Sequence, residues 1–266
     1  MGRPPVAATV RSSADIRAFF DRLAPFFGDF HGPAQKGLKS RLALIRKHAA
    51  PEKEQTILEI GCGRGDHLLA LLDTRQRGIG IDLSPAMIRE ARGRALSSPA
   101  RERVIFLEGN AEDLSCLGDC SVGLAFAVGA FEHMFDKLAV AKSVFRVLRP
   151  GGCFLCLSPN GEFLWYTRLA PRLKINTRHL SSDVFLSRSQ FGRFFSLAGF
   201  SEPEIFYWDF IPRGDVPARW GLFLGGLDLT GKFILPHKLR GGILVRALKP
   251  CPGEGGHKDH GDGRGA

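Results

Sequence analysis

Three glycines follow a short apolar run and precede a helical pattern in ILEIGCGRGDHLLALL, residues 57–72. Gly61, Gly63 and Gly65 let the backbone turn sharply and approach a ligand without a Cβ in the way. Asp82 ends the next predicted strand, where a carboxylate can accept hydrogen bonds from both hydroxyls of a ribose. Asp82 on its own would fit the start of a turn equally well. The glycine turn beside it favours the ribose role and predicts a nucleoside site.

The turn does not match a dinucleotide fingerprint. That fingerprint is G-x-G-x-x-G, and its third glycine lets the helix pack closely on the strand. Asp66 stands at the third position here, and its carboxylate would repel a pyrophosphate at the helix N-terminus. The pattern therefore excludes an NAD-type ligand and leaves a single nucleoside.

The elements that must hold these residues alternate between strand and helix from Pro51 onward. Apolar runs bounded by glycine or polar residues predict strands, and Ser84 followed by Pro85 predicts the start of a helix. This order predicts an α/β fold with a doubly wound, mainly parallel sheet and helices on both faces. The predicted strands are QTILEIG, RGIGID, RVIFLEGN, SVGLAFAV, GCFLCLSP, EIFYWDFI and GGILVRALK, and the predicted helices between them are HLLALLD, SPAMIREARGRAL, DKLAVAKSVFRVL and SRSQFGRFFSLAG.

The chain divides into four regions by pattern. An N-terminal helical cap (residues 1–50) begins near Ser12 or Ser13 and is interrupted at Pro25. The other three regions are a nucleoside-binding core (51–160), a substrate lid with the remaining strands of the same domain (161–249), and a glycine-rich tail expected to be disordered (250–266).

Composition sets the class of protein. The 266 residues are 44% hydrophobic and 24% charged, which excludes a disordered, collagen-like or disulfide-stapled chain. We expect a cytoplasmic protein, because no apolar run is long enough for a membrane span or a signal peptide.

The net charge of +10 comes from the flanks, since residues 1–50 and 161–249 each carry +6. Such flanks suit an anionic substrate, a nucleic acid or a phospholipid surface, or they form an ordinary solvated surface.

The six cysteines do not suggest a metal site. Cys153 and Cys156 are three residues apart in a predicted strand, so their side chains should point to opposite faces of the sheet. Cys116 and Cys120 have no second pair nearby. We therefore expect neither a metal nor a disulfide framework.

Five motifs occur in an order that resembles the class I S-adenosylmethionine-dependent methyltransferases of the small-molecule type. The resemblance is strong over residues 40–160 and weaker through HLSSDVFLSRSQFGRFFSLAGF. It implies a Rossmann-like sheet of seven strands with the last strand antiparallel, and S-adenosylmethionine as cofactor. The motifs are ILEIGCGRGDH, GIDLSPAMI, IFLEGNAEDL, AFEHM and LRPGG.

The resemblance also assigns cofactor contacts by position. The methionine part should lie over the glycine turn, the ribose on Asp82, and the methyl group near the end of the fourth strand. Asn110 stands where the family usually has Asp, and Gly123 replaces another usual Asp; the first change removes a charge and keeps an acceptor. The implied residues are Glu59, Gly61, Cys62, Gly63 and Gly65 at the turn, Asp82 at the ribose, Leu83, Asn110 and Ala111 at the adenine, and Ala127 and Val128 near the methyl group.

Three residues are candidates for catalysis. Glu132 and His133 follow the fourth strand and reach its carboxyl end, and His133 suits a general base. His179 lies in the lid, where similar His–Leu segments of the family approach the substrate. A structural role for each stays open. No Asn-Pro-Pro-Tyr motif and no cysteine loop is present, which argues against the adenine-methylating and cytosine C5-methylating branches.

We expect most aromatic residues of the cap to pack in the core and some to line a pocket for an apolar acceptor. Together with the basic flanks they suggest a small molecule with an apolar body and an acidic group, methylated by in-line displacement. An RNA methyltransferase and a non-catalytic cofactor-binding protein are the alternatives. We favour the small molecule over nucleic acid, because no dense Lys/Arg stripe interleaved with aromatics occurs; contact with a membrane surface stays open. The cap residues are Phe19, Phe20, Phe26, Phe27, Phe30, Trp220, Phe223, Leu224 and Phe233.

Overall fold

The computed structural model describes most of the chain. Three expectations fall outside the described residues: the lid residue His179, the tail beyond residue 252, and the cap residues Phe30, Trp220, Phe223, Leu224 and Phe233. The described ranges are 9–27, 34–49, 51–52, 55–175, 177–178, 180–208 and 236–252.

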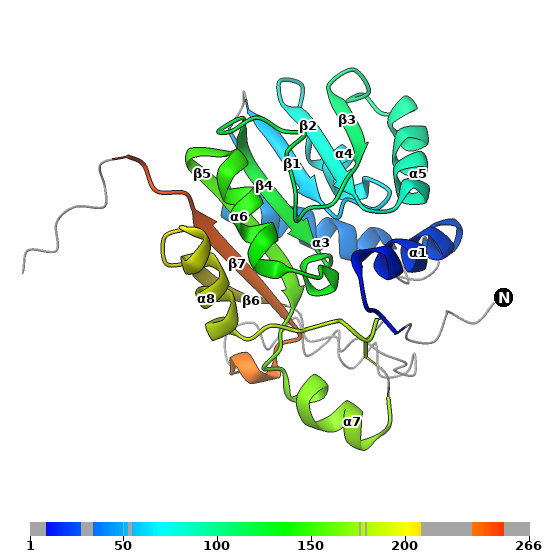
Figure 1. Cartoon of the computed structure of the whole chain (residues 1–266), viewed down its shortest axis with the longest axis vertical. Coiled ribbons are helices and arrows are strands. Elements are labelled where there is room, and N and C mark those ends of the chain that lie inside the picture. The colour runs from blue at the N-terminus through cyan, green and yellow to red at the C-terminus, as the bar shows by residue number, and fades with distance from the viewer. Residues whose placement is uncertain are drawn as a thin grey trace, which may run out of the picture.

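A seven-stranded sheet forms the centre of the molecule, in the order β3-β2-β1-β4-β5-β7-β6 (Figure 1). The first five strands pair in parallel, whereas β7 pairs antiparallel with both β5 and β6. The predicted strand count, the mainly parallel order and the antiparallel last strand are confirmed. The strands are β1 (Thr56–Ile60), β2 (Arg77–Asp82), β3 (Val104–Glu108), β4 (Val122–Val128), β5 (Leu148–Pro159), β6 (Glu204–Trp208) and β7 (Gly242–Leu248).

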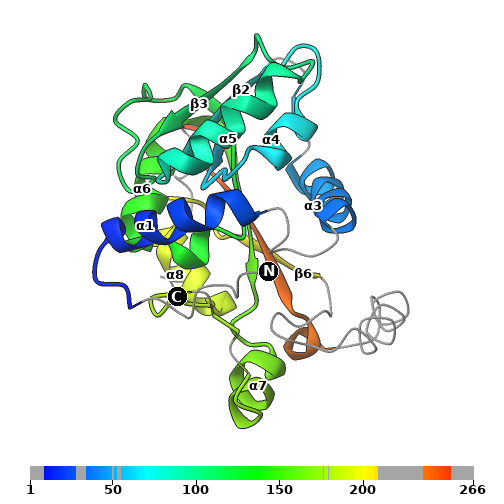
Figure 2. The same ribbon diagram turned by 90° about the vertical axis from the view of Figure 1, so that its right-hand side faces the viewer.

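Helices cover both faces of the sheet (Figures 1 and 2). The apolar side chains of α3 (Ala34–Ala49), α4 (Asp66–Leu71) and α5 (Pro85–Leu96) join the core on one face. Those of α6 (Lys137–Val147) and α8 (Arg188–Ala198) join the core on the other. Burial on both faces explains why the parallel strands are nearly continuous apolar runs.

Side chains cap three of these helices, and the sequence predicts the cap of α5. The Ser84 hydroxyl accepts a hydrogen bond from the Met87 N–H at 3.1 Å, and Pro85 occupies the first helical position of α5. Asp136 accepts from two N–H groups of the first turn of α6. Ser187 and Gln190 form a capping box at α8. The helix α6 ends at Val147, before Pro150, because the chain enters β5 directly.

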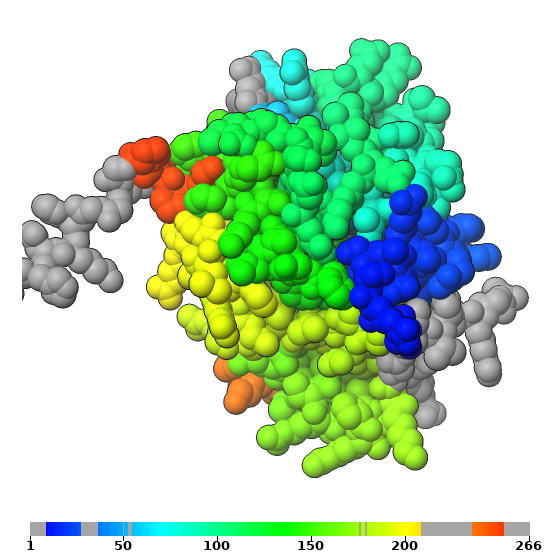
Figure 3. Space-filling model, in the orientation of Figure 1, coloured from blue at the N-terminus to red at the C-terminus, as the bar shows by residue number. Residues whose placement is uncertain are grey.

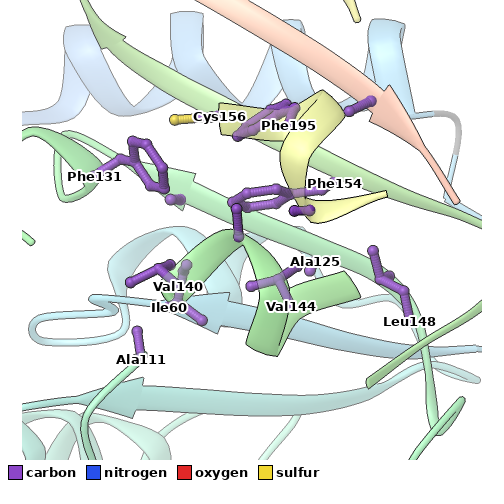
Figure 4. Packing of buried hydrophobic residues seen from close by; sticks show 14 of the residues in the cluster. Ile60, Ala111, Ala125, Phe131, Val140, Val144, Leu148, Phe154, Cys156 and Phe195 are labelled. Carbon is purple, nitrogen blue, oxygen red and sulfur yellow. The ribbon is translucent and has the colours of Figure 1, made fainter. Parts of the chain in front are cut away.

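Phenylalanine rings in mostly edge-to-face and tilted contact fill the core between the sheet and α6 and α8. Phe131, Phe154, Phe191 and Phe195 are fully buried, with ring centroids 5.3–6.2 Å apart (Figure 4). Such aromatic pairs stabilise a core beyond their apolar area.

The predicted geometry of the cysteine pair in β5 is confirmed. Cys156 packs in the core under α6 and α8, and Cys153 packs on the opposite face, so the two thiols cannot share a metal ion. All six cysteines are free thiols. Over the described ranges, no group of three or more His, Cys, Asp or Glu is arranged to hold a metal ion. In the same part of the chain, no helix combines the length and apolar character needed to cross a bilayer.

A long loop leaves the sheet after β5 and returns beside its own starting point. The Gly161 N–H donates to the Leu186 carbonyl at 3.0 Å, and a Cβ at Gly161 would overlap the Phe185 carbonyl oxygen. Between these ends lie a π-helical turn, η3 (Trp165–Leu169), and a short helix, α7 (Ala170–Arg172). This loop extends beyond the last strands in both ribbon views (Figures 1 and 2).

The aromatic core yields a stability prediction. Replacing Phe195 by alanine should lower the free energy of unfolding by about 3–5 kcal/mol, because the cavity left behind cannot close fully. The measurement is denaturant unfolding followed by circular dichroism. The matched control is Leu197→Ala on the same helix, where the side chain is 56% exposed and the change should stay within about 0.5 kcal/mol. Equal losses in both variants would contradict the assigned packing.

Candidate functional site

A cavity lies at the carboxyl ends of β1, β2 and β4, and α1 (Ser13–Leu23) forms part of its wall. This edge of a parallel sheet is where ligands bind in open α/β folds. Most of the residues that the sequence assigned to a cofactor line it, together with His133. They are Glu59, Gly61, Cys62, Gly63, Asp82, Leu83, Asn110, Ala111 and Val128.

The glycine turn after β1 forms one side of the cavity. Gly61 has a φ of +62°, and a Cβ there would collide with the Cβ of Ala130. The Cys62 N–H donates to the Ile81 carbonyl at 3.1 Å, which ties the turn to β2. Only glycine at position 61 meets both the left-handed backbone and the close contact.

The Asp82 carboxylate connects the glycine turn to the end of β2. One of its oxygens accepts the Gly63 N–H at 2.8 Å and the other accepts the Ser84 N–H at 2.9 Å. Burial raises the pKa of the Asp82 carboxyl above its ordinary value, while these two hydrogen bonds oppose the rise. Each carboxylate oxygen has a second lone pair, so the group can accept further hydrogen bonds from a ligand in the cavity.

Glu59 is almost fully buried at the end of β1 and holds the start of α4. Its carboxylate accepts the Leu68 N–H at 3.1 Å and lies 3.4 Å from His67 Nδ1. Burial raises the pKa of the Glu59 carboxyl, and the hydrogen bond from His67 opposes the rise. The carboxylate thus fixes the helix that follows the glycine turn while one side of it faces the cavity.

The Cys62 thiol lines the cavity as a buried, unreactive group. Burial raises its pKa well above the ordinary value, and the neighbouring carboxylates of Asp82 and Glu59 raise it further. A thiol in this state is protonated at neutral pH and serves as an apolar surface.

Asn110 forms a local turn at the cavity wall. Its side-chain oxygen accepts the Glu112 N–H at 3.0 Å, the hydrogen bond that an aspartate would make in the same place. The substitution from the usual family residue therefore changes the charge of the wall and keeps its backbone geometry.

Hydrogen bonds and an ion pair hold the helix α1 at the carboxyl ends of β2 and β3. Asp21 accepts the Ser84 hydroxyl at 2.6 Å and the Ala86 N–H at 3.1 Å, so a residue of the cap joins the N-terminus of α5. Arg17 forms an ion pair with Glu108 at the end of β3, at 2.9 Å. These contacts bring Phe20 into the cavity wall.

His133 lies on the same cavity and is paired with a buried acid. Its Nδ1 is 2.6 Å from an Asp183 oxygen, and the other Asp183 oxygen accepts the Leu180 N–H at 3.0 Å. Because a carboxylate only accepts, Nδ1 carries the proton in the neutral ring and Nε2 is left as the acceptor. The ring of Phe20 packs against the imidazole at 5.4 Å. This is the arrangement of an oriented general base.

Three expected site residues do not line the cavity. Glu132 was expected at the cavity, but its side chain is fully buried and accepts the Ser158 hydroxyl at 3.1 Å. Ala127 was expected there as well, but it packs in the core under α6 and α8. Gly65 is the N-cap residue of α4, and its backbone lies against the Phe106 ring. It therefore contributes to the turn without lining the cavity.

The sequence interpretation missed Asp183 and Asp21. Asp183 is fifty residues from His133 and follows two serines, a context that also fits an ordinary loop. Asp21 falls on the polar side of an amphipathic helix, where aspartate is common. Neither position shows its partner without the tertiary structure.

A family model for a methyltransferase domain matches residues 57–152, from the second residue of β1 to the start of β5, including the glycine turn and Asp82. This part of the chain is a methyltransferase domain of the class I S-adenosylmethionine-dependent type.

Curated relatives of this chain match over part of their length. A protein of Mycolicibacterium smegmatis named "Probable S-adenosylmethionine-dependent methyltransferase" is 34% identical over 126 residues, which cover 47% of this chain and 46% of the relative. A demethylmenaquinone methyltransferase of Symbiobacterium thermophilum is 29% identical over 161 residues, which cover 58% and 62%. The chain therefore spans less than two thirds of the length of these two relatives.

Among solved structures, a SAM-dependent methyltransferase from Thermotoga maritima has the same fold. The TM-score is 0.64, and the superposition covers 88% of the present chain and 99% of the Thermotoga maritima chain at 20% sequence identity. At this identity the likeness concerns the fold alone.

The turn geometry yields a prediction for Gly61. Gly61→Ala should lower the free energy of unfolding by more than about 1 kcal/mol, because alanine is strained at positive φ and its Cβ meets Ala130. Thermal unfolding and calorimetric titration with S-adenosylmethionine measure the loss of stability and of affinity. The control is Gly93→Ala inside α5, where nothing lies within 4 Å and alanine should stabilise the helix by up to about 1 kcal/mol. Unchanged stability and affinity in the Gly61 variant would contradict the turn.

Proposed function

We propose that this chain transfers a methyl group from S-adenosylmethionine to a small molecule with an apolar body. The observation that carries the proposal is one cavity lined both by Asp82 beside the glycine turn and by His133 paired with Asp183. Methyl transfer to a hydroxyl or amine needs a site that holds the nucleoside of the cofactor and a base that takes the proton of the substrate. The cavity offers both, Asp82 for the nucleoside and His133 for the proton. The relatives named as methyltransferases support the same activity.

The residues at the turn fit the cofactor. Asp82 offers carboxylate oxygens for ribose hydroxyls, and Leu83, Asn110 and Ala111 supply the wall expected at the adenine. Within the described residues, Arg64 Nε and His67 Nε2 are buried polar atoms without a hydrogen-bond partner, and both side chains line the cavity. The Arg64 N–H suits the carboxylate of an amino-acid group, whereas His67 Nε2 is an acceptor in the neutral ring, because Nδ1 donates to Glu59.

The chemistry divides between the cofactor and the chain. Bound S-adenosylmethionine supplies a methyl group on a positively charged sulfur, which needs no further activation. His133 is proposed to take the proton of the acceptor at Nε2, while Asp183 holds the ring and stabilises its charged form. Phe20, packed on the imidazole, keeps water from that side.

Much of the rest of the cavity wall is apolar, and this favours one class of methyl acceptor. Aromatic and aliphatic side chains from α1 and from the segment after β4 make up most of it, and cofactor atoms would not cover all of them. An acceptor with a hydrocarbon or aromatic body is therefore favoured over a sugar or an amino acid. These residues are Ile16, Phe20, Leu23, Phe27, Met134 and Phe135.

One experiment separates this proposal from methylation of RNA and from binding without catalysis. The full chain is incubated with methyl-labelled S-adenosylmethionine and an extract of the source cell, divided into small-molecule and RNA fractions. Label in the small-molecule fraction is expected, and mass analysis identifies the acceptor. Label confined to RNA, or tight cofactor binding with no labelled product, would overturn the proposal.

Asp82→Asn should weaken cofactor binding. The variant loses a charge-assisted acceptor for the ribose, so the binding free energy should fall by about 1–3 kcal/mol in calorimetry. Asp113→Asn is the control, because Asp113 is exposed, lies outside the cavity and accepts only a local N–H from Ser115. Equal affinity in both variants would reject the ribose contact, provided that circular dichroism shows both to be folded.

His133→Gln and Asp183→Asn should lower kcat by roughly 10²-fold or more while the KM for the cofactor changes little. The amide that the second variant introduces can donate to Nδ1 and so favours the wrong tautomer, which gives this variant a specific reason to fail. Steady-state kinetics with the identified acceptor provides the measurement. His48→Gln, on α3 and stacked on Phe206, is the control and should keep wild-type kcat. Wild-type kcat in all three would show that the acceptor needs no base.

A further inference from the structure

The loop after β5 carries a projecting segment, residues 163–175, with the sequence FLWYTRLAPRLKI. It includes η3 and α7, and it lies at one end of the molecule, beyond β6 and β7, in both ribbon views and in the space-filling view (Figures 1, 2 and 3). The segment contains three basic residues and no acidic residue. Its function is not explained by the cavity, because none of its residues lines it.

Two leucines of the projecting segment are exposed. Leu169 is 48% exposed and Leu173 is 61% exposed. They are four residues apart in a helical turn, and the Leu173 N–H donates to the Leu169 carbonyl at 3.0 Å, so both side chains lie on one side. Large apolar side chains exposed together usually mark a contact surface.

Basic side chains accompany the leucines at the same spacing. Arg168 and Arg172 are exposed and each precedes one of the two leucines, and Lys174 follows. Within the described residues, none of these three cations forms an ion pair with a carboxylate. The segment therefore carries exposed leucines beside basic side chains that, in the described part of the chain, have no carboxylate partner.

The inner side of the segment is held in place by aromatic packing. Phe163 and Ala170 are buried, and the Tyr166 ring packs on Phe163 at 5.1 Å and on Phe185 at 4.8 Å. The exposed leucines are thus on the outer side of an anchored turn, and burying them inward would require breaking this packing.

We propose that the projecting segment is a docking surface for a bilayer that contains anionic phospholipid. Leucines enter the boundary between headgroups and acyl chains, while adjacent arginine and lysine side chains pair with lipid phosphates. A nucleic acid would use the cations and gain little from the leucines. A second copy of this chain would bring its own three cations against these three, which charge repulsion opposes.

Residues that follow the docking surface in the chain pack against residues of the cavity wall. Leu180 packs with Ile16, Phe19 and Leu23 of α1, and Asp183 holds His133. A bilayer contact at the projecting segment would therefore keep α1 and the cavity close to a source of apolar acceptors. This consequence rests on the proposed function, whereas the docking surface itself does not.

Vesicle sedimentation tests the docking surface on the full chain without any methyl donor. The probes are vesicles of equimolar phosphatidylglycerol and phosphatidylcholine, and vesicles of phosphatidylcholine alone. Binding is expected to the anionic vesicles and should weaken as salt rises. Arg168→Gln with Arg172→Gln should lower the partition coefficient by more than tenfold, since each cation contributes roughly fivefold. Leu169→Ser with Leu173→Ser should lower it by about tenfold or more.

Matched double variants elsewhere on the surface provide the controls. Leu96→Ser with Leu197→Ser removes leucines that are 75% and 56% exposed on α5 and α8, and Arg101→Gln with Arg193→Gln removes the same charge. Both should bind vesicles like the parent chain. All variants should keep the parent affinity for S-adenosylmethionine in calorimetry, so a failure of the docking surface is distinguishable from a failure of the cofactor site.

Three results would overturn the inference. The first is equal vesicle binding by the parent and both variants of the projecting segment. The second is loss of binding only in the arginine variant, which would indicate a general polyanion site such as one for RNA. The third is a dimer in sedimentation velocity that the leucine variant abolishes in the absence of lipid, which would assign the leucines to a second copy of the chain.

Discussion

The hydrogen bond from the Gly63 N–H to the Asp82 carboxylate is the contact on which the candidate site depends. It joins the turn after β1 to the end of β2, two points nineteen residues apart, and both must approach closely for the cavity to have a floor. The approach requires the left-handed backbone at Gly61, because any side chain there would push the turn into Ala130. The buried carboxylate is stable in turn because two backbone N–H groups replace the water it has lost.

The half of the fold that carries this contact could be predicted from the sequence because its signals are local. Glycine turns, N-caps such as Ser84 and apolar runs each depend on a few neighbouring residues, and they agree with one another along residues 51–160. The β-strand spacing of Cys153 and Cys156 is equally local and correctly separates the two thiols. The antiparallel last strand came from the family resemblance.

The other half of the site depends on long-range contacts that no local pattern contains. Asp183 reaches His133 across fifty residues, and Asp21 reaches Ser84 across sixty-three. Glu132 illustrates the opposite error: its position after β4 suggested access to a ligand, yet the short helical turn Phe131–His133 points His133 to the cavity and buries Glu132 beside Ser158. Adjacent residues in such a turn face different directions, so proximity in sequence could not distinguish them.

The two ends of the loop after β5 lie side by side, and this determines how far the loop can vary in length and sequence. Because Gly161 and Leu186 are joined by a backbone hydrogen bond, the twenty-four residues between them form a closed excursion from the sheet. Doubling the length of such an excursion costs only about 0.6 kcal/mol in closure entropy. The outer part of the loop can therefore change in length and sequence with little effect on the stability of the sheet. Asp183, three residues before the return point, marks the inner limit of what can be exchanged, because the imidazole beside the cavity relies on it.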